Sequence, residues 1–218
     1  MSKAESITKI NFEDDSVGQD PKSFATMIGD WYVSDDKGNK VFCVDGRKWA
    51  KGKVASGVAE KARALYGDRY AEFLDRVQTF AYFPLAVFKP VENFKNGDIS
   101  MRFKGVGGKI DQCAGIVFNM KPNGDYLIFR GNSAENNVVL WKYEKGKRKA
   151  LKWIRKLQVP SGRWNEISVA IKGAKIDGFY NGNKVLDYTF TEPIDGKVGL
   201  WSKADSLMYF DDYTVTKE

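Results

Sequence analysis

The chain contains no histidine, so the side chain that most often acts as a general base, a nucleophile activator or a transition-metal ligand is absent. Ser-His-Asp and Cys-His catalysis are therefore excluded. Two cysteines, Cys43 and Cys113, are too few for a disulfide scaffold or a cysteine-based zinc site. We expect both to be small core residues, and their redox state stays open. Any catalysis must use carboxylates, Lys, Arg or Tyr, or a metal bound by oxygen ligands.

A mixture of aromatic and forked polar side chains occurs in the middle of the chain and near its end. If Leu127 and Phe129 face a core, then residues 126, 128 and 130 face the opposite way, because strand side chains alternate. Aromatic rings stack on the C–H surfaces of sugars, and planar Arg and Asn groups bind neighbouring hydroxyls. The predicted ligand-binding residues are Tyr126, Arg130, Asn137, Trp141, Trp201 and Lys203. The alternative is that the tryptophans are core residues and Arg130 pairs at the surface.

Arg130 lies in the segment DYLIFRG, and the most specific of these predictions concerns its side chain. We expect its guanidinium to line a concave, partly open pocket, within hydrogen-bond reach of Asn137 and beside Trp141 or Trp201. On this hypothesis, alanine at position 130 weakens ligand binding and leaves thermal stability almost unchanged.

The formal charge of +7 is unevenly distributed. Residues 142–156 hold eight Lys or Arg against Glu144 alone, whereas residues 1–45 hold five Lys against nine Asp or Glu. The basic segment, with Trp153 and Ile154 among its charges, is typical either of a solvated hairpin or of a surface for anionic polymers. A nucleic-acid partner is not expected, because no nucleic-acid fold signature accompanies the charge.

The elements that position these residues are short strands. From residue 99 onward, apolar alternation is interrupted by turn signals such as KPNG at 121–124 and NGN at 181–183, which indicates about ten strands joined by hairpins. Residues 57–80 differ, since their apolar residues have helical spacing and Gly67 indicates a break between two short helices. We therefore predict an all-β jelly-roll sandwich of two antiparallel sheets, a single domain over residues 1–218 with a helical insert.

The order of these segments resembles a known superfamily. AGIVFNM, DYLIFR, NNVVLWKYEKGKR, RWNEISVAIKGAKIDGFYNGNKVLD and GKVGLWSKADSLMYFDDYTV follow one another as in concanavalin A-like lectins and glucanases, in particular the laminin G-like branch and bacterial 3-keto-disaccharide hydrolase-type domains. The likeness covers residues 99–216, and residues 45–90 depart from it. Glucanases of this superfamily carry a Glu-x-Asp-x-x-Glu or Glu-x-Asp-x-Glu strand, which this chain lacks.

Laminin G-like sandwiches also bring the first and last strands together. By this resemblance, Asp14 or Asp15 would lie near Asp211 or Asp212, where carboxylates and loop carbonyls suit Ca²⁺. Solvated strand-end carboxylates are the alternative, because the multi-Asp loop of strong calcium sites is absent. No other cofactor is expected.

Three functions fit the sequence. The first is a carbohydrate-binding domain without catalysis, whose partner is a saccharide or anionic glycan. The second is a hydrolase of the 3-keto-disaccharide type, and the third is a protein-interaction domain that uses the helical insert. No membrane-spanning segment is expected. The N-terminus lacks the apolar core of a secretory signal, which favours either a cytoplasmic protein or a mature extracytoplasmic form that begins after one.

Overall fold

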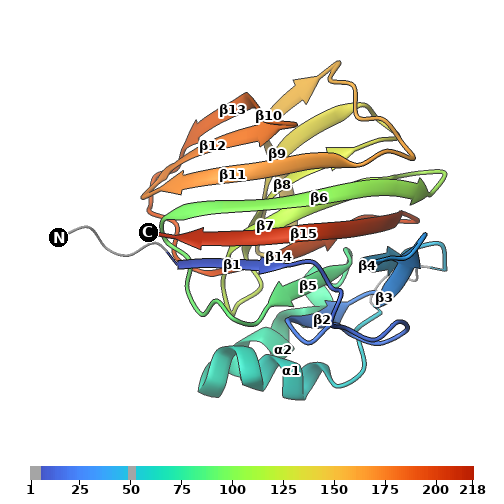
Figure 1. Cartoon of the computed structure of the whole chain (residues 1–218). Helices are drawn as coiled ribbons and strands as arrows, with labels where there is room; N and C mark the ends of the chain where they lie inside the picture. Colours follow the sequence, from blue (N-terminus) through green and yellow to red (C-terminus); the bar gives the residue numbers. More distant parts are fainter. Residues whose placement is uncertain (1–5, 49–52) are drawn as a thin grey trace.

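The computed structural model describes residues 6–48 and 53–218, which form two antiparallel sheets packed face to face with two short helices against one of them (Figure 1). This arrangement confirms the predicted jelly-roll sandwich. Its strands are β1 (Ser6–Ile10), β2 (Phe24–Ile28), β3 (Trp31–Asp36), β4 (Asn39–Asp45), β5 (Leu85–Phe88), β6 (Gly97–Gly107), β7 (Cys113–Met120), β8 (Tyr126–Asn132), β9 (Asn137–Glu144), β10 (Lys147–Arg155), β11 (Asn165–Lys172), β12 (Lys175–Tyr180), β13 (Asn183–Thr189), β14 (Lys197–Ser202) and β15 (Leu207–Lys217).

The two sheets interleave distant parts of the chain. The eight-stranded sheet has the order β13-β12-β11-β6-β15-β4-β3, and β1 pairs with β15 beside this path. The seven-stranded sheet has the order β10-β9-β8-β7-β14-β5-β2. Strand β15 pairs with β4 over its first residues and with β1 over its last, so the two ends of the described chain lie side by side (Figure 1).

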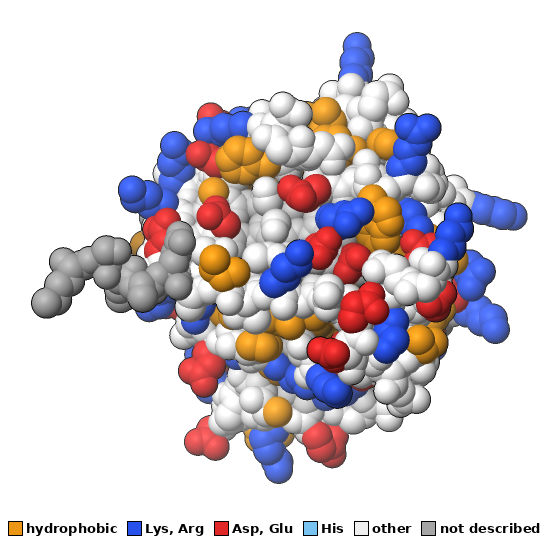
Figure 2. All heavy atoms as spheres, in the orientation of Figure 1, with side chains coloured by type: hydrophobic (Ala, Val, Ile, Leu, Met, Phe, Trp, Pro, Cys, Tyr) orange, Lys and Arg blue, Asp and Glu red, His pale blue; other side chains and the backbone are white. Residues whose placement is uncertain are grey.

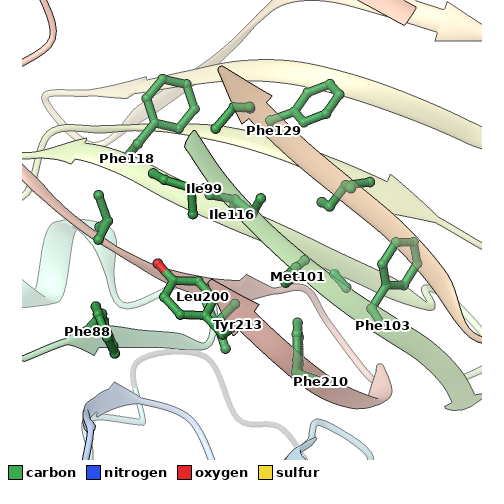
Figure 3. Packing of buried hydrophobic residues seen from close by; sticks show 14 of the residues in the cluster. Phe88, Ile99, Met101, Phe103, Ile116, Phe118, Phe129, Leu200, Phe210 and Tyr213 are labelled. Carbon is green, nitrogen blue, oxygen red and sulfur yellow. The ribbon is translucent and has the colours of Figure 1, made fainter. Parts of the chain in front are cut away.

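The core lies between the sheets and is built by strand alternation. On β6, Ile99, Met101 and Phe103 point inward and meet residues of β7, β8 and β15 (Figure 3). Gly131 on β8 faces Phe103, and a Cβ at this position would lie 2.8 Å from the ring atom Cζ. A glycine here lets the ring pack directly on the opposite strand.

The hairpins end in residues that accept a left-handed backbone. Asn181 and Gly182 between β12 and β13 have φ angles of 47° and 77°, and Lys145 and Gly146 between β9 and β10 have 50° and 76°. Two successive positive φ angles are the requirement of type I′ hairpin turns, which follow the twist of the flanking strands. The predicted basic hairpin at 142–156 is confirmed as β9 and β10.

The helical insert covers one face of the seven-stranded sheet. Helix α1 (Val58–Tyr66) ends directly before Gly67, a 3-10 turn follows over Gly67–Arg69, and α2 (Tyr70–Phe80) completes the insert. The predicted break at Gly67 is therefore confirmed. Ala62, Leu65, Phe73 and Val77 are buried against the sheet. Neither helix combines the length and apolar composition needed to span a bilayer, within the part of the chain that is described.

Candidate functional site on the seven-stranded sheet

The predicted ligand-binding residues lie together on the outer face of the seven-stranded sheet, the face that points away from the core. Cross-strand pairing places Arg130 opposite Val139 and Ile128 opposite Trp141 on this face. The six residues come from three strands of this sheet, of which β9 and β8 are neighbours and β14 is separated from β8 by β7, and from one adjoining loop: Tyr126 and Arg130 from β8, Asn137 and Trp141 from β9, Trp201 from β14, and Lys203 after it. The predicted phase of these strands is therefore confirmed.

Most of these side chains are buried, contrary to the expectation of a partly open pocket. Arg130 is 1% exposed and Trp201 is fully buried. The Phe83 ring, from the loop after α2, lies 5.0 Å from Trp201. The guanidinium of Arg148 on β10 lies 4.2 Å from the Trp141 ring and 5.1 Å from the Phe83 ring. The insert and β10 thus cover the outer face of the seven-stranded sheet, which the sequence pattern predicted to be partly open to solvent.

Arg130 forms the centre of a buried polar network. Its Nη1 donates to Asn137 Oδ1 at 2.5 Å, as predicted, and its Nη2 donates to Glu135 Oε2 at 3.2 Å. Asn137 Nδ2 donates to the same Glu135 oxygen at 3.0 Å. Burial acts to raise the pKa of Glu135, but the hydrogen bond from Asn137 and the charge of Arg130 outweigh it, so this pKa lies below its usual value. Glu135 is therefore held ionised.

Lys203 belongs to a second network at the same end of the sheet. Its Nζ lies 2.9 Å from Asp111 Oδ2, and Asn132 Nδ2 donates to Asp111 Oδ1 at 2.8 Å. Asp111 is almost fully buried, so this ion pair joins the loop after β14 to the loop before β7. A charge buried in this way is retained only when it is paired.

The exposed aromatic residue at this end is Trp153 on β10, which the sequence placed in the basic segment and not among the ligand-binding residues. Trp153 is 37% exposed, and its ring lies edge-on to that of Trp141 with centroids 5.6 Å apart. The guanidinium of Arg155 lies 4.7 Å from the ring centroid and that of Arg130 lies 5.7 Å from it. An exposed indole beside cationic and amide donors is suited to stack on a sugar ring.

A β-bulge explains why alternation could not place Trp153. The β9–β10 register shifts between Ala150 and Lys152, so Ala150 lies opposite Trp141 while Trp153 lies opposite Val139. Strict alternation from Ala150 would have turned Trp153 to the other face. The extra residue returns the indole to the outer face, which is a common use of bulges on edge strands.

The acidic residues proposed as calcium ligands have other contacts. Asp211 Oδ2 accepts from Asn39 Nδ2 at 3.0 Å, and Asp212 pairs with Lys9 at 2.9 Å and with Arg102 at 3.1 Å. Asp15 Oδ1 accepts the backbone N–H of residue 22, while the Asp14 backbone carbonyl accepts the Nζ of that residue. Among the described residues, no three His, Cys, Asp or Glu side chains are grouped so that they could hold a metal ion. Calcium binding by these residues stays a prediction.

Both cysteines are buried, as expected, and neither forms a disulfide. Burial raises the pKa of the Cys43 thiol to about 12 and that of the Cys113 thiol to about 11. Because the thiolate is the reactive form, neither side chain is suited to act as a nucleophile near neutral pH.

Comparison with known proteins identifies the fold. No family model and no curated protein matches the sequence. Among solved structures, the carbohydrate-binding module CBM66 of Bacillus subtilis superposes with a TM-score of 0.62 at 11% identity, covering 88% of this chain and 95% of that one. A Bacillus licheniformis β-glucanase gives 0.54 at 10% identity, with 97% and 92% covered, and the Crh5 transglycosylase in complex with NAG gives 0.56 at 12%, with 97% and 84% covered. The chain therefore shares the jelly-roll sandwich fold of these structures.

Proposed function

We propose that this protein binds a saccharide without cleaving it, on the outer face of the seven-stranded sheet, with Trp153 as the stacking platform. The observation that carries the proposal is the exposed indole of Trp153 above the Arg130–Asn137–Glu135 network. The solved structures that share the fold include a carbohydrate-binding module and enzymes that act on glycans, which supports this class of ligand.

The electrostatics of the site favour binding over hydrolysis. A retaining or inverting glycosidase needs one carboxylic acid whose pKa is raised, so that it can protonate the leaving oxygen. Glu135, the carboxylate nearest to the platform in this network, has a lowered pKa and is shared between Arg130 and Asn137. It is suited to accept hydrogen bonds from ligand hydroxyls and not to deliver a proton.

The helical insert supports the sheet and offers little for a protein partner. The large hydrophobic residues that stay exposed in the described chain are Ile7, Val17, Tyr82, Val106, Ile110 and Trp153. None of these lies in α1 or α2, whose apolar side chains larger than alanine, where described, pack in one cluster with the sheet. An interaction surface on the insert would need an exposed apolar patch.

The test is calorimetric titration of neutral and acidic oligosaccharides into the protein and two tryptophan variants. Trp153→Ala should weaken binding at least about tenfold, because a stacked ring contributes about 1.5 kcal/mol or more. Trp164→Ala is the matched control, since Trp164, just before β11, also lies close to two cations, Arg102 at 5.0 Å and Lys104 at 5.1 Å, which belong to β6 of the eight-stranded sheet. Its binding should match the wild type.

Two results would overturn the proposal. Binding that survives Trp153→Ala and is lost in Trp164→Ala would assign the ligand to the other sheet. Release of shorter sugars during incubation, followed by chromatography, would show that the protein is a hydrolase.

A further inference from the structure

A second cavity, of about 570 Å³, lies beside the end of α1 and apart from the Trp153 platform. Its size suits a monosaccharide or a small organic acid. The wall combines four cations with two acids, namely Arg63, Arg69, Lys121 and Lys197 with Glu92 and Asp195.

Lys197 is the unusual group in this wall. It is only 6% exposed, yet no carboxylate oxygen of the described residues lies within ion-pair distance of its Nζ. Its contacts are the Glu92 carbonyl oxygen at 3.3 Å and the Tyr66 ring, whose centroid is 5.6 Å away. Burial lowers the pKa of Lys197, although the charge of Glu92 partly opposes this. A buried ammonium group without a counter-ion is costly, and an anion at this position would stabilise it.

Two residues of the wall each carry a polar atom that is buried without a hydrogen-bond partner among the described residues. One is the Tyr66 hydroxyl, whose ring is fixed by stacking on Phe73 at 5.5 Å. Burial raises the pKa of Tyr66, so this hydroxyl stays protonated and can donate. The other is Asp195 Oδ1, an acceptor, since Lys95 contacts only the Oδ2 of this carboxylate, at 3.3 Å.

A cavity near Trp31, of about 630 Å³, gives a comparison, because lysines in its wall have ion-pair and hydrogen-bond partners. There Lys61 Nζ donates to Asp20 Oδ2 at 2.9 Å and to Thr26 Oγ1 at 2.7 Å. Lys53 pairs with Asp30. Lys53 and Lys61 therefore have counter-ions here, and the third lysine of this wall, Lys48, is exposed to solvent, so none of them is a buried charge that requires a ligand.

We propose that the cavity beside α1 binds a hydroxylated oxyanion, namely a sugar acid or a sugar phosphate. Lys197 Nζ and the Tyr66 hydroxyl would donate to the anionic group, and Asp195 Oδ1 would accept a hydroxyl of the same ligand. The acceptor argues for a ligand with hydroxyls, because a bare anion would be repelled by this carboxylate. This cavity is separate from the Trp153 platform, since the two sites share no residue.

The proposal is tested by calorimetric titration of the full chain with four probes: D-glucuronate, glucose 6-phosphate, glucose and acetate. Binding of glucuronate or glucose 6-phosphate, and weaker binding of glucose and acetate, is expected. The two anionic probes distinguish a carboxylate from a phosphate. Lys197→Met should weaken the bound anion at least about tenfold, as loss of a charged hydrogen bond does. Tyr66→Phe should weaken it about fivefold.

Two controls separate this site from the rest of the protein. Lys53→Met removes a lysine of the larger cavity and should leave binding unchanged, as should Trp153→Ala. The proposal is overturned if neither anionic sugar binds, if glucose binds as tightly as its anionic derivatives, or if the anion is lost in Trp153→Ala and kept in the cavity variants. If Lys197→Met does not fold, the test uses Tyr66→Phe, which removes a single oxygen atom. Unchanged anion binding by this variant would then overturn the proposal.

Discussion

The outer faces of the two sheets differ in what covers them. On the eight-stranded sheet, strands such as β6 and β11 alternate between buried residues and residues that are exposed or partly exposed, and charged side chains of both signs are scattered over this face (Figure 2). On the seven-stranded sheet, every residue of β8 and β14 is buried. The helices, Phe83 and Arg148 account for the difference, because they exclude solvent from this second face. Polar groups on an open face can form hydrogen bonds with water. On a covered face their hydrogen-bond partners have to come from the protein.

The largest effect that tests this comparison is removal of a helix anchor. Phe73→Ala in α2 should lower the free energy of unfolding by about 3–5 kcal/mol, because Phe73 is fully buried between the helix and the sheet. Phe179→Ala is the matched control, since Phe179 lies on the outer face of β12 and is only partly buried. Its cost should be about 1 kcal/mol. Equal losses in urea unfolding would show that the insert does not stabilise the sheet.

The next effect concerns Arg130 and corrects the sequence-based expectation that its loss leaves stability unchanged. Because Arg130 is buried and donates charged hydrogen bonds to Asn137 and to the partly exposed Glu135, Arg130→Met should cost about 1.5–3 kcal/mol, the usual value of such hydrogen bonds. Arg155→Met removes an exposed guanidinium that, like that of Arg130, lies over the Trp153 ring, and it should cost less than about 0.5 kcal/mol. A thermal unfolding midpoint for Arg130→Met equal to that of Arg155→Met would contradict the buried network.

A smaller effect is expected where the insert meets β9. The Tyr143 hydroxyl donates to the Thr79 backbone carbonyl at 2.7 Å, which links the last turn of α2 to the sheet. Tyr143→Phe should lower the free energy of unfolding by about 1 kcal/mol and speed amide hydrogen exchange at the end of α2. Unchanged exchange in this turn would show that packing alone holds the insert in place.

The smallest effect is the pH dependence that Glu135 contributes. Its folded-state pKa lies below the ordinary value of 4.5, so the stability from ionised Glu135 is complete above that pH and is lost as pH falls through the folded pKa. Glu135→Gln has no group to titrate there. Between neutral pH and about pH 3, the variant should lose less stability than the wild type, with a difference below about 1 kcal/mol. A greater loss of stability in Glu135→Gln than in the wild type would contradict the lowered folded-state pKa of Glu135.

Much of the fold could be predicted because its signals are local. Alternation placed Leu127 and Phe129 in the core and Arg130 on the other face, and Asn-Gly and glycine turns located the hairpins. The spacing of residues 57–80 predicted two helices with a break at Gly67. Each of these features depends on backbone geometry within a few residues, which the chain specifies without reference to its distant parts.

The accessibility of the site was decided by the tertiary structure. A strand pattern states which way Arg130 and Trp201 point, but whether solvent reaches them depends on where α2 and the Phe83 loop pack, through contacts between distant segments. The exposure of Trp153 likewise follows from a one-residue bulge against β9, which no local period encodes. The sequence alone determined the strand faces and the absence of histidine chemistry. Only the packing of distant segments determined which aromatic ring a ligand can reach, because burial is a property of the assembled surface and not of one strand.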